Sequence, residues 1–105
     1  MDYILPTQLA DERAKFLVVD VRDEDYDAKW RVPGSVNFPS ETFGDDAMSE
    51  LADLAHGKDA IVFHCMYSQQ RGPTCARMFA AKYPEVTVKV LRGGYQGWRE
   101  MEQCK

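Results

Sequence analysis

The chain has 105 residues and a formal net charge of −4, and its lysines and arginines are scattered, which argues against a nucleic-acid-binding surface. No segment approaches the roughly 18 apolar residues that span a bilayer, and the N-terminus lacks the basic-then-apolar order of a signal peptide. Three scattered cysteines fit neither a disulfide framework nor a zinc site. We therefore expect one domain in a reducing compartment, cytoplasmic or alternatively nuclear, with no metal and no membrane or nucleic-acid partner.

Helices and strands alternate in the apolar pattern along the chain. The continuous apolar runs Phe16–Val21 and Ala60–Phe63 are typical of strands buried on both faces of a sheet. We place the N-cap of the first helix at Thr7 and expect Pro73 at the first position of the helix that follows the second run. The expected helices cover residues 5–14, 23–29, 48–55, 73–83 and 95–101, and the expected strands cover residues 16–21, 35–38, 60–63 and 86–91.

This alternation predicts an α/β domain with a mostly parallel central sheet flanked by helices on both faces. In such sheets the ligand site lies beyond the carboxyl ends of the strands. Cys65 follows one expected strand, Asp20 and Arg22 end an earlier one, and Arg92–Gly94 follow a later one. We expect these segments to meet at one edge of the sheet.

The segment from Cys65 to Arg71 carries the chemistry. A strand-to-helix turn points successive backbone N–H groups inward, and the helix N-terminus adds positive potential. Such a loop binds a tetrahedral oxyanion and lowers the pKa of a thiol at its base. We predict Cys65 as the nucleophile and Arg71 as a bidentate clamp on the anion. The other loop residues expected to surround the anion are Met66, Tyr67, Ser68, Gln69, Gln70 and Gly72.

Three motifs resemble those of rhodanese-homology domains, in the branch that contains the cell-division-cycle dual-specificity phosphatases and the eukaryotic arsenate reductases. They are Val18–Arg22, the loop His64–Pro73 and the segment Leu91–Trp98, and Gly34–Pro39 resembles the second-strand motif of that family. The resemblance extends from about residue 3 to residue 101. It implies a single rhodanese-like catalytic domain over residues 1–105.

Loop length separates the branches of this family. Sulfurtransferases typically carry a catalytic loop one residue shorter, whereas the Cys-x5-Arg form of this chain resembles that of phosphatases and arsenate reductases. The resemblance thus implies oxyanion chemistry at Cys65 and disfavours persulfide transfer. A non-catalytic anion-binding module is a further alternative, which the presence of both Cys65 and Arg71 disfavours.

The choice between the two remaining activities depends on a proton donor. Hydrolysis of a phosphomonoester requires protonation of the leaving group, and residues 66–70 contain no carboxylate, unlike the loops of the cell-cycle phosphatases. Thiolate attack on arsenate expels only hydroxide or water before a second thiol reduces the arsenic. We therefore expect a thiol-dependent arsenate reductase. The alternative is a small protein-tyrosine or dual-specificity phosphatase with a phosphocysteine intermediate, in which Asp20, Asp23 or a substrate carboxylate supplies the proton.

A reductase also needs a second thiol. Cys75 is the candidate resolving thiol, although a packed core thiol is the favoured interpretation, and Cys104 is expected to be unrelated to the chemistry. If neither resolves Cys65, an external thiol must do so. The resemblance to the arsenate reductases implies glutathione, with glutaredoxin as a protein partner, and no bound cofactor.

The neighbours of the loop have alternative roles. Ser68 either donates a hydrogen bond to the thiolate or caps the turn, and Tyr67 either contacts substrate or projects into solvent. The resemblance favours Asp20, with Arg22 beside it, orienting loops over Asp20 acting as a general acid. His64 is interpreted as structural, because adjacent strand residues point to opposite faces. The two tryptophans, Trp30 and Trp98, are expected to pack in the core or beneath loops.

Overall fold

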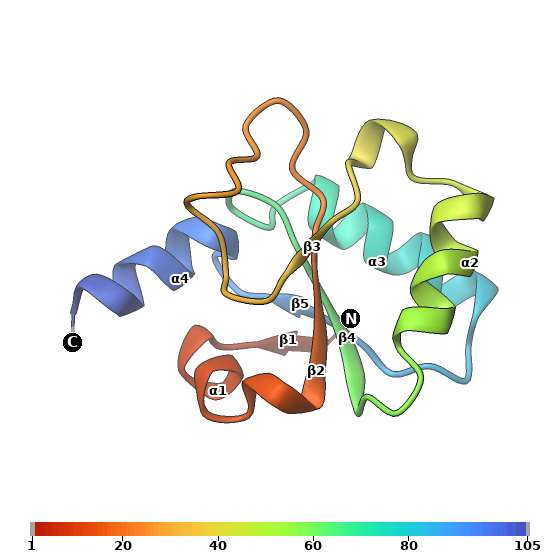
Figure 1. The fold of residues 1–105 in the computed structure, drawn as a ribbon, viewed down its shortest axis with the longest axis horizontal. Coiled ribbons are helices and arrows are strands. Elements are labelled where there is room, and N and C mark those ends of the chain that lie inside the picture. Colours follow the sequence, from red (N-terminus) through yellow and green to blue (C-terminus); the bar gives the residue numbers. More distant parts are fainter. Residues whose placement is uncertain (1, 105) are drawn as a thin grey trace.

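Five parallel strands form the centre of the molecule in the order β1-β5-β4-β2-β3 (Figure 1). The computed structural model describes residues 2–104. The strands are β1 (Asp2–Ile4), β2 (Phe16–Asp20), β3 (Val36–Asn37), β4 (Ala60–His64) and β5 (Val88–Leu91). The α-helices are α1 (Pro6–Asp11), α2 (Asp45–Leu54), α3 (Arg71–Lys82) and α4 (Gly94–Gln103), and short 3₁₀ helices cover Arg13–Lys15 and Ser40–Thr42. The expected parallel α/β architecture is confirmed.

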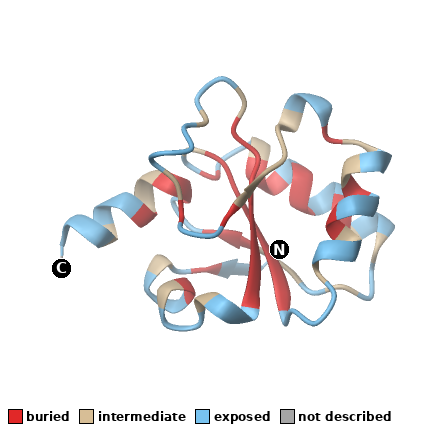
Figure 2. Cartoon of the chain, viewed as in Figure 1, coloured by how far each residue is buried: buried red, intermediate tan, exposed pale blue. Residues whose placement is uncertain are grey.

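The two central strands, β2 and β4, are buried along their whole length (Figure 2). Their side chains alternate between two cores. Val19 of β2 and Phe63 of β4 belong to the core beneath α2 and α3. Val18 and Val62, one residue earlier in each strand, belong to the core beneath α1 and α4. This alternation explains why both strands are continuous apolar runs, since every position faces a helix layer.

The local predictions differ from the structure at the first strand and at the starts of two helices. The edge strand β1 was not expected, because three residues are too few to show a pattern; it pairs with β5. Helix α1 begins at Pro6 with Leu5 as its N-cap, so Thr7 is not the cap. Helix α3 begins at Arg71, which makes Pro73 its third residue instead of its first.

Residues 23–29 form turns in place of the expected short helix. Aspartate side chains in this segment accept hydrogen bonds from nearby backbone N–H groups, from Lys29 to Asp27 at 2.8 Å and from Asp23 to Asp25 at 3.1 Å. Such bonds compete with helical hydrogen bonding, which accounts for the difference. Within residues 2–104, none of the helices combines the length and apolar character needed to cross a membrane.

Candidate active site

The loop that follows β4 places Cys65 at the N-terminus of α3. The Cys65 side chain is buried, and its Sγ accepts a hydrogen bond from the backbone N–H of Gly72 at 3.4 Å. A Cβ atom at Gly72 would lie only 3.2 Å from the Cα of His64, so glycine permits this close approach. The first turn of α3 therefore directs its positive end at the sulfur, an arrangement that favours negative charge there.

A second helix N-terminus supports the base of the same loop. The backbone N–H groups of Tyr95 and Gln96, at the start of α4, donate to the carbonyl oxygens of Cys65 at 3.0 Å and Met66 at 2.9 Å. Gly94 has a φ of +60°, and a Cβ atom there would lie 2.6 Å from both oxygens. The sequence predicted that Arg92–Gly94 would lie near Cys65 at one edge of the sheet, and the structure shows that the start of α4 anchors the first two carbonyls of the loop.

A pocket of about 210 Å³ opens at the loop and is lined by Cys65, Tyr67, Gln69, Gln70 and Arg71. Tyr67 is 57% exposed at this pocket, which is consistent with either of its predicted roles. The Met66 side chain is turned away and packs against the core beneath α1 and α4, so only its backbone can serve the loop. Ser68 is buried with a φ of +56°, and its hydroxyl has no hydrogen-bond partner among the described residues, so it makes neither of its two predicted bonds, to Cys65 or as a cap of the turn.

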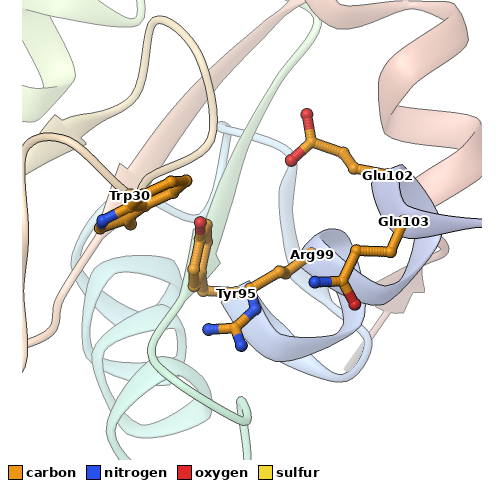
Figure 3. Close-up of a pocket in the computed structure, with 5 residues that line it drawn as sticks. All are labelled: Trp30, Tyr95, Arg99, Glu102 and Gln103. Atoms are coloured by element: carbon orange, nitrogen blue, oxygen red, sulfur yellow. The ribbon is translucent and has the colours of Figure 1, made fainter.

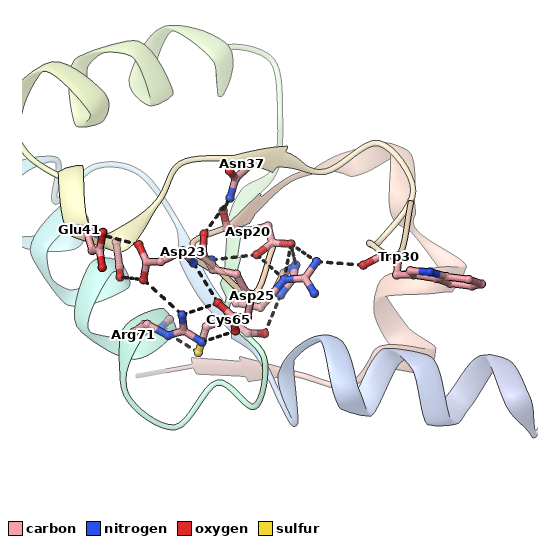
Figure 4. A network of polar contacts seen from close by, with 12 residues as sticks. Asp20, Asp23, Asp25, Trp30, Asn37, Glu41, Cys65 and Arg71 are labelled. Atoms are coloured by element: carbon pink, nitrogen blue, oxygen red, sulfur yellow. Dashed lines mark hydrogen bonds and ion pairs between the residues drawn. The ribbon is translucent and has the colours of Figure 1, made fainter. Parts of the chain in front are cut away.

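The guanidinium of Arg71, which is predicted to clamp the anion, is hydrogen-bonded to two aspartates in the structure (Figure 4). Its Nη1 and Nη2 donate to Oδ1 and Oδ2 of Asp25 at 2.8 and 2.7 Å, and Nη1 also donates to Oδ2 of Asp23 at 3.2 Å. The hydrogen bonds from Arg71 lower the pKa of Asp25 to about 2. Burial raises the pKa of Asp23, but hydrogen bonds from Ser40, Glu41 and Arg71 outweigh that effect and lower it. Both carboxylates are therefore ionised near neutral pH.

Asp20 and Arg22 form a fully buried ion pair at the end of β2. The Nη2 of Arg22 donates to Oδ2 of Asp20 at 2.7 Å and to the carbonyl oxygen of Trp30 at 3.0 Å. The guanidinium also lies over the ring of Tyr95, 4.6 Å from its centroid. The pair thus links β2, the following loop and α4, a geometry consistent with the predicted orienting role.

His64 is fully buried beside this pair, with its Nε2 3.9 Å from Oδ2 of Asp20. Its Nδ1 lies 3.0 Å from the carbonyl oxygen of Cys65, and its Nε2 has no hydrogen-bond partner among residues 2–104. Burial lowers the pKa of His64, although the nearby Asp20 carboxylate acts in the opposite direction. The imidazole is accordingly neutral at pH 7 and does not supply a cation to Cys65.

The two other cysteines differ in environment. Cys75 lies on the inner side of α3 in the same core as Phe79, and burial raises its pKa to about 12. Cys104 is exposed at the end of α4. Among the described residues, no group of three or more His, Cys, Asp or Glu side chains is arranged to hold a metal ion.

A larger pocket of about 350 Å³ lies outside this site, between the loop carrying Trp30 and helix α4 (Figure 3). It is lined by Trp30, Tyr95, Arg99, Glu102 and Gln103 and contains neither Cys65 nor Arg71. Trp30 is 61% exposed, so the prediction that it packs in the core or beneath a loop is wrong, whereas Trp98 is buried as expected. The pocket at Cys65 is therefore the candidate active site, despite its smaller volume.

A parallel α/β domain of this strand order, with a Cys-x5-Arg loop beyond its central strand, has a rhodanese-type fold. The family model for the Rhodanese-like domain matches residues 5–101, and the chain belongs to this family.

Relatives of two kinds are similar to the chain. It is 36% identical to Dual specificity phosphatase Cdc25 of Arabidopsis thaliana, over 93% of this chain and 73% of the relative. It is 38% identical to Arsenate reductase 2.2 of Oryza sativa subsp. japonica, over 87% of this chain and 78% of the relative. The solved As-Sb reductase from Leishmania major superposes with a TM-score of 0.82 at 30% identity, over 98% of this chain and 79% of that one. The predicted branch of the family is confirmed, and it contains both reductases and phosphatases.

Proposed function

We propose that the chain is a thiol-dependent arsenate reductase that converts arsenate to arsenite, with Cys65 as the nucleophile. The observation that carries this proposal is the pairing of Arg71 with both nearby carboxylates, Asp23 and Asp25. This pairing helps to lower the pKa of each carboxyl and so to keep both ionised near neutral pH. An ionised carboxylate cannot protonate an alkoxide or phenoxide leaving group, and residues 66–70 contain no further carboxyl group. Arsenate carries its own hydroxyl groups, and thiolate attack expels one as hydroxide or water.

The reaction proceeds in two thiol steps. Backbone N–H groups of the loop and Arg71 bind the arsenate oxygens, and the Cys65 sulfur attacks arsenic, forming an S–As bond as an As–OH bond breaks. A glutathione thiolate then attacks the Cys65 sulfur. An S–S bond forms, the S–As bond breaks, and its electron pair stays on arsenic, which leaves as arsenite. A further thiol, delivered by glutathione or glutaredoxin, reduces the Cys65 mixed disulfide and restores the thiol.

A phosphatase is the second candidate function. Relatives in Arabidopsis thaliana and yeast carry that name, and the site contains two carboxylates beside Arg71. In this alternative Cys65 attacks phosphorus to give a phosphocysteine, which water hydrolyses. Asp23 or Asp25 would have to become protonated during the reaction, because the pKa of each carboxyl is lowered here.

Two assays on the same preparation distinguish these functions. The first follows arsenate-dependent NADPH oxidation coupled through glutathione, glutathione reductase and glutaredoxin, and the second follows hydrolysis of an aryl phosphate. Arsenate turnover with little hydrolysis is the expected result. Brisk hydrolysis without arsenate turnover would reverse the assignment and mean that a carboxylate outside residues 66–70 donates the proton.

Replacing Cys75 by alanine is expected to leave arsenate turnover within about twofold of that of the wild type. The Cys75 thiol is buried with a pKa raised to about 12, so it forms little of the thiolate that would resolve Cys65. The coupled NADPH assay measures this, with thermal unfolding as the check on folding. A folded Cys75→Ala protein that has lost arsenate turnover would contradict the external route and make Cys75 the resolving thiol.

A further inference from the structure

The guanidinium of Arg71 is engaged by Asp25 in the geometry that an oxyanion would use. Two parallel N–H···O bonds join Nη1 and Nη2 to the two carboxylate oxygens, at 2.8 and 2.7 Å. Phosphate and arsenate present pairs of oxygens to an arginine in the same bidentate manner. Arg71 also lines the pocket that contains Cys65. A carboxylate from another segment of the chain therefore accepts the two N–H groups of Arg71 that are expected to bind the substrate.

The two aspartates on Arg71 are anchored to different degrees. Asp23 accepts hydrogen bonds from the Ser40 hydroxyl at 2.5 Å and from the backbone N–H of Glu41 at 2.9 Å, and its side chain is 11% exposed. Asp25 accepts a hydrogen bond from the backbone N–H of Asp23 at 3.1 Å and interacts with its own backbone N–H, both within its own turn, and its side chain is 35% exposed. A partly exposed carboxylate loses little when it returns to water, so Asp25 is the member that can leave.

We propose that Asp25 is an internal competitor of the oxyanion for Arg71 and that it determines the affinity of the site. When an oxyanion binds, two of its oxygens replace the Asp25 carboxylate, while Asp23 keeps its contact with Nη1 and holds the guanidinium at the pocket. The inference rests on the proposed function only in requiring an oxyanion at Cys65, and it applies equally to arsenate and phosphate.

The test uses Asp25→Asn, which removes the charge but keeps the size of the side chain. Glu24→Gln is the matched control, because Glu24 is an exposed neighbour in the same segment and the removed charge is the same. Inorganic phosphate and arsenate protect Cys65 from iodoacetamide, and mass spectrometry of the Cys65 peptide gives the alkylation rate at each anion concentration. For each protein, the alkylation rate at each anion concentration is divided by the rate without anion, at constant ionic strength. A substitution that changes the reactivity of the thiol therefore does not change the dissociation constant obtained.

Asp25→Asn is expected to lower the dissociation constant of both anions about threefold to fivefold, and Glu24→Gln to leave it unchanged. If the anions protect the wild type but Asp25→Asn binds them equally or more weakly, the competitor role is overturned and the oxyanion site stands. An equal gain in Glu24→Gln would overturn it as well, since net charge would then explain the effect. Failure of both anions to protect any of the proteins would overturn this inference together with the proposed function.

Discussion

Replacing Cys65 by serine is expected to lower arsenate turnover at least about a thousandfold, to the rate at which the thiols react alone. A serine hydroxyl is not ionised at the N-terminus of α3 as a thiol can be. Its oxygen also cannot take part in the second step, in which an S–S bond forms and an electron pair passes to arsenic. The coupled NADPH assay measures the loss directly.

A matched cysteine controls for the general effect of removing a thiol. Cys104 is exposed at the end of α4, so Cys104→Ser is expected to turn over arsenate as the wild type does. In Cys65→Ser the backbone N–H of Gly72 still has an acceptor at residue 65, which favours an intact fold; thermal unfolding checks this. Reduction by folded Cys65→Ser above the thiol background would show that the nucleophile is a different group.

The two central strands of the sheet and the position of the loop could be predicted from apolar runs, whereas the three-residue edge strand β1 could not. A strand that is buried on both faces carries apolar side chains at successive positions. The strands Phe16–Asp20 and Ala60–His64 are therefore recognisable as apolar segments, each followed by one polar residue at its carboxyl end. Parallel strands share one carboxyl edge, and this brings Asp20, Cys65 and Arg92 to the same side of the molecule. The roles of Cys65 and Arg71 in catalysis remain predictions.

The partners of Arg71 could not be predicted in the same way. Asp25 lies 46 residues away in the chain, and its position depends on the path of residues 21–35, in which the pattern predicted a short helix over residues 23–29. Local aspartate-to-backbone bonds replace that helix by turns, and the turns carry Asp23 and Asp25 to the pocket. Trp30 lies in the same segment and was misplaced for the same reason. The conformation of an irregular segment is determined by side-chain hydrogen bonds, and these leave no periodic pattern in the sequence.

Gly94→Ala is the second change with a large expected effect, because it acts on the anchor beneath the loop. An alanine Cβ would lie 2.6 Å from the carbonyl oxygens of Cys65 and Met66, and both are backbone atoms that cannot rotate away. The φ of +60° adds strain of its own. We expect the free energy of unfolding in urea to fall by about 2–5 kcal/mol. We also expect arsenate kcat/KM to fall about a hundredfold, because displacement of the loop misplaces the sulfur.

Gly57→Ala separates the two causes of this effect. Gly57 has a φ of +83°, close to that of Gly94, but a Cβ atom there would meet nothing within 4 Å. The Gly57→Ala protein should therefore be destabilised only by the backbone strain, about 1–2 kcal/mol, and should keep full arsenate turnover. If Gly94→Ala behaved like Gly57→Ala in both measurements, the N-terminus of α4 would not hold the loop. A larger loss confined to Gly94→Ala would show that the start of α4, through the hydrogen bonds from Tyr95 and Gln96, holds the loop in the position that the reaction needs.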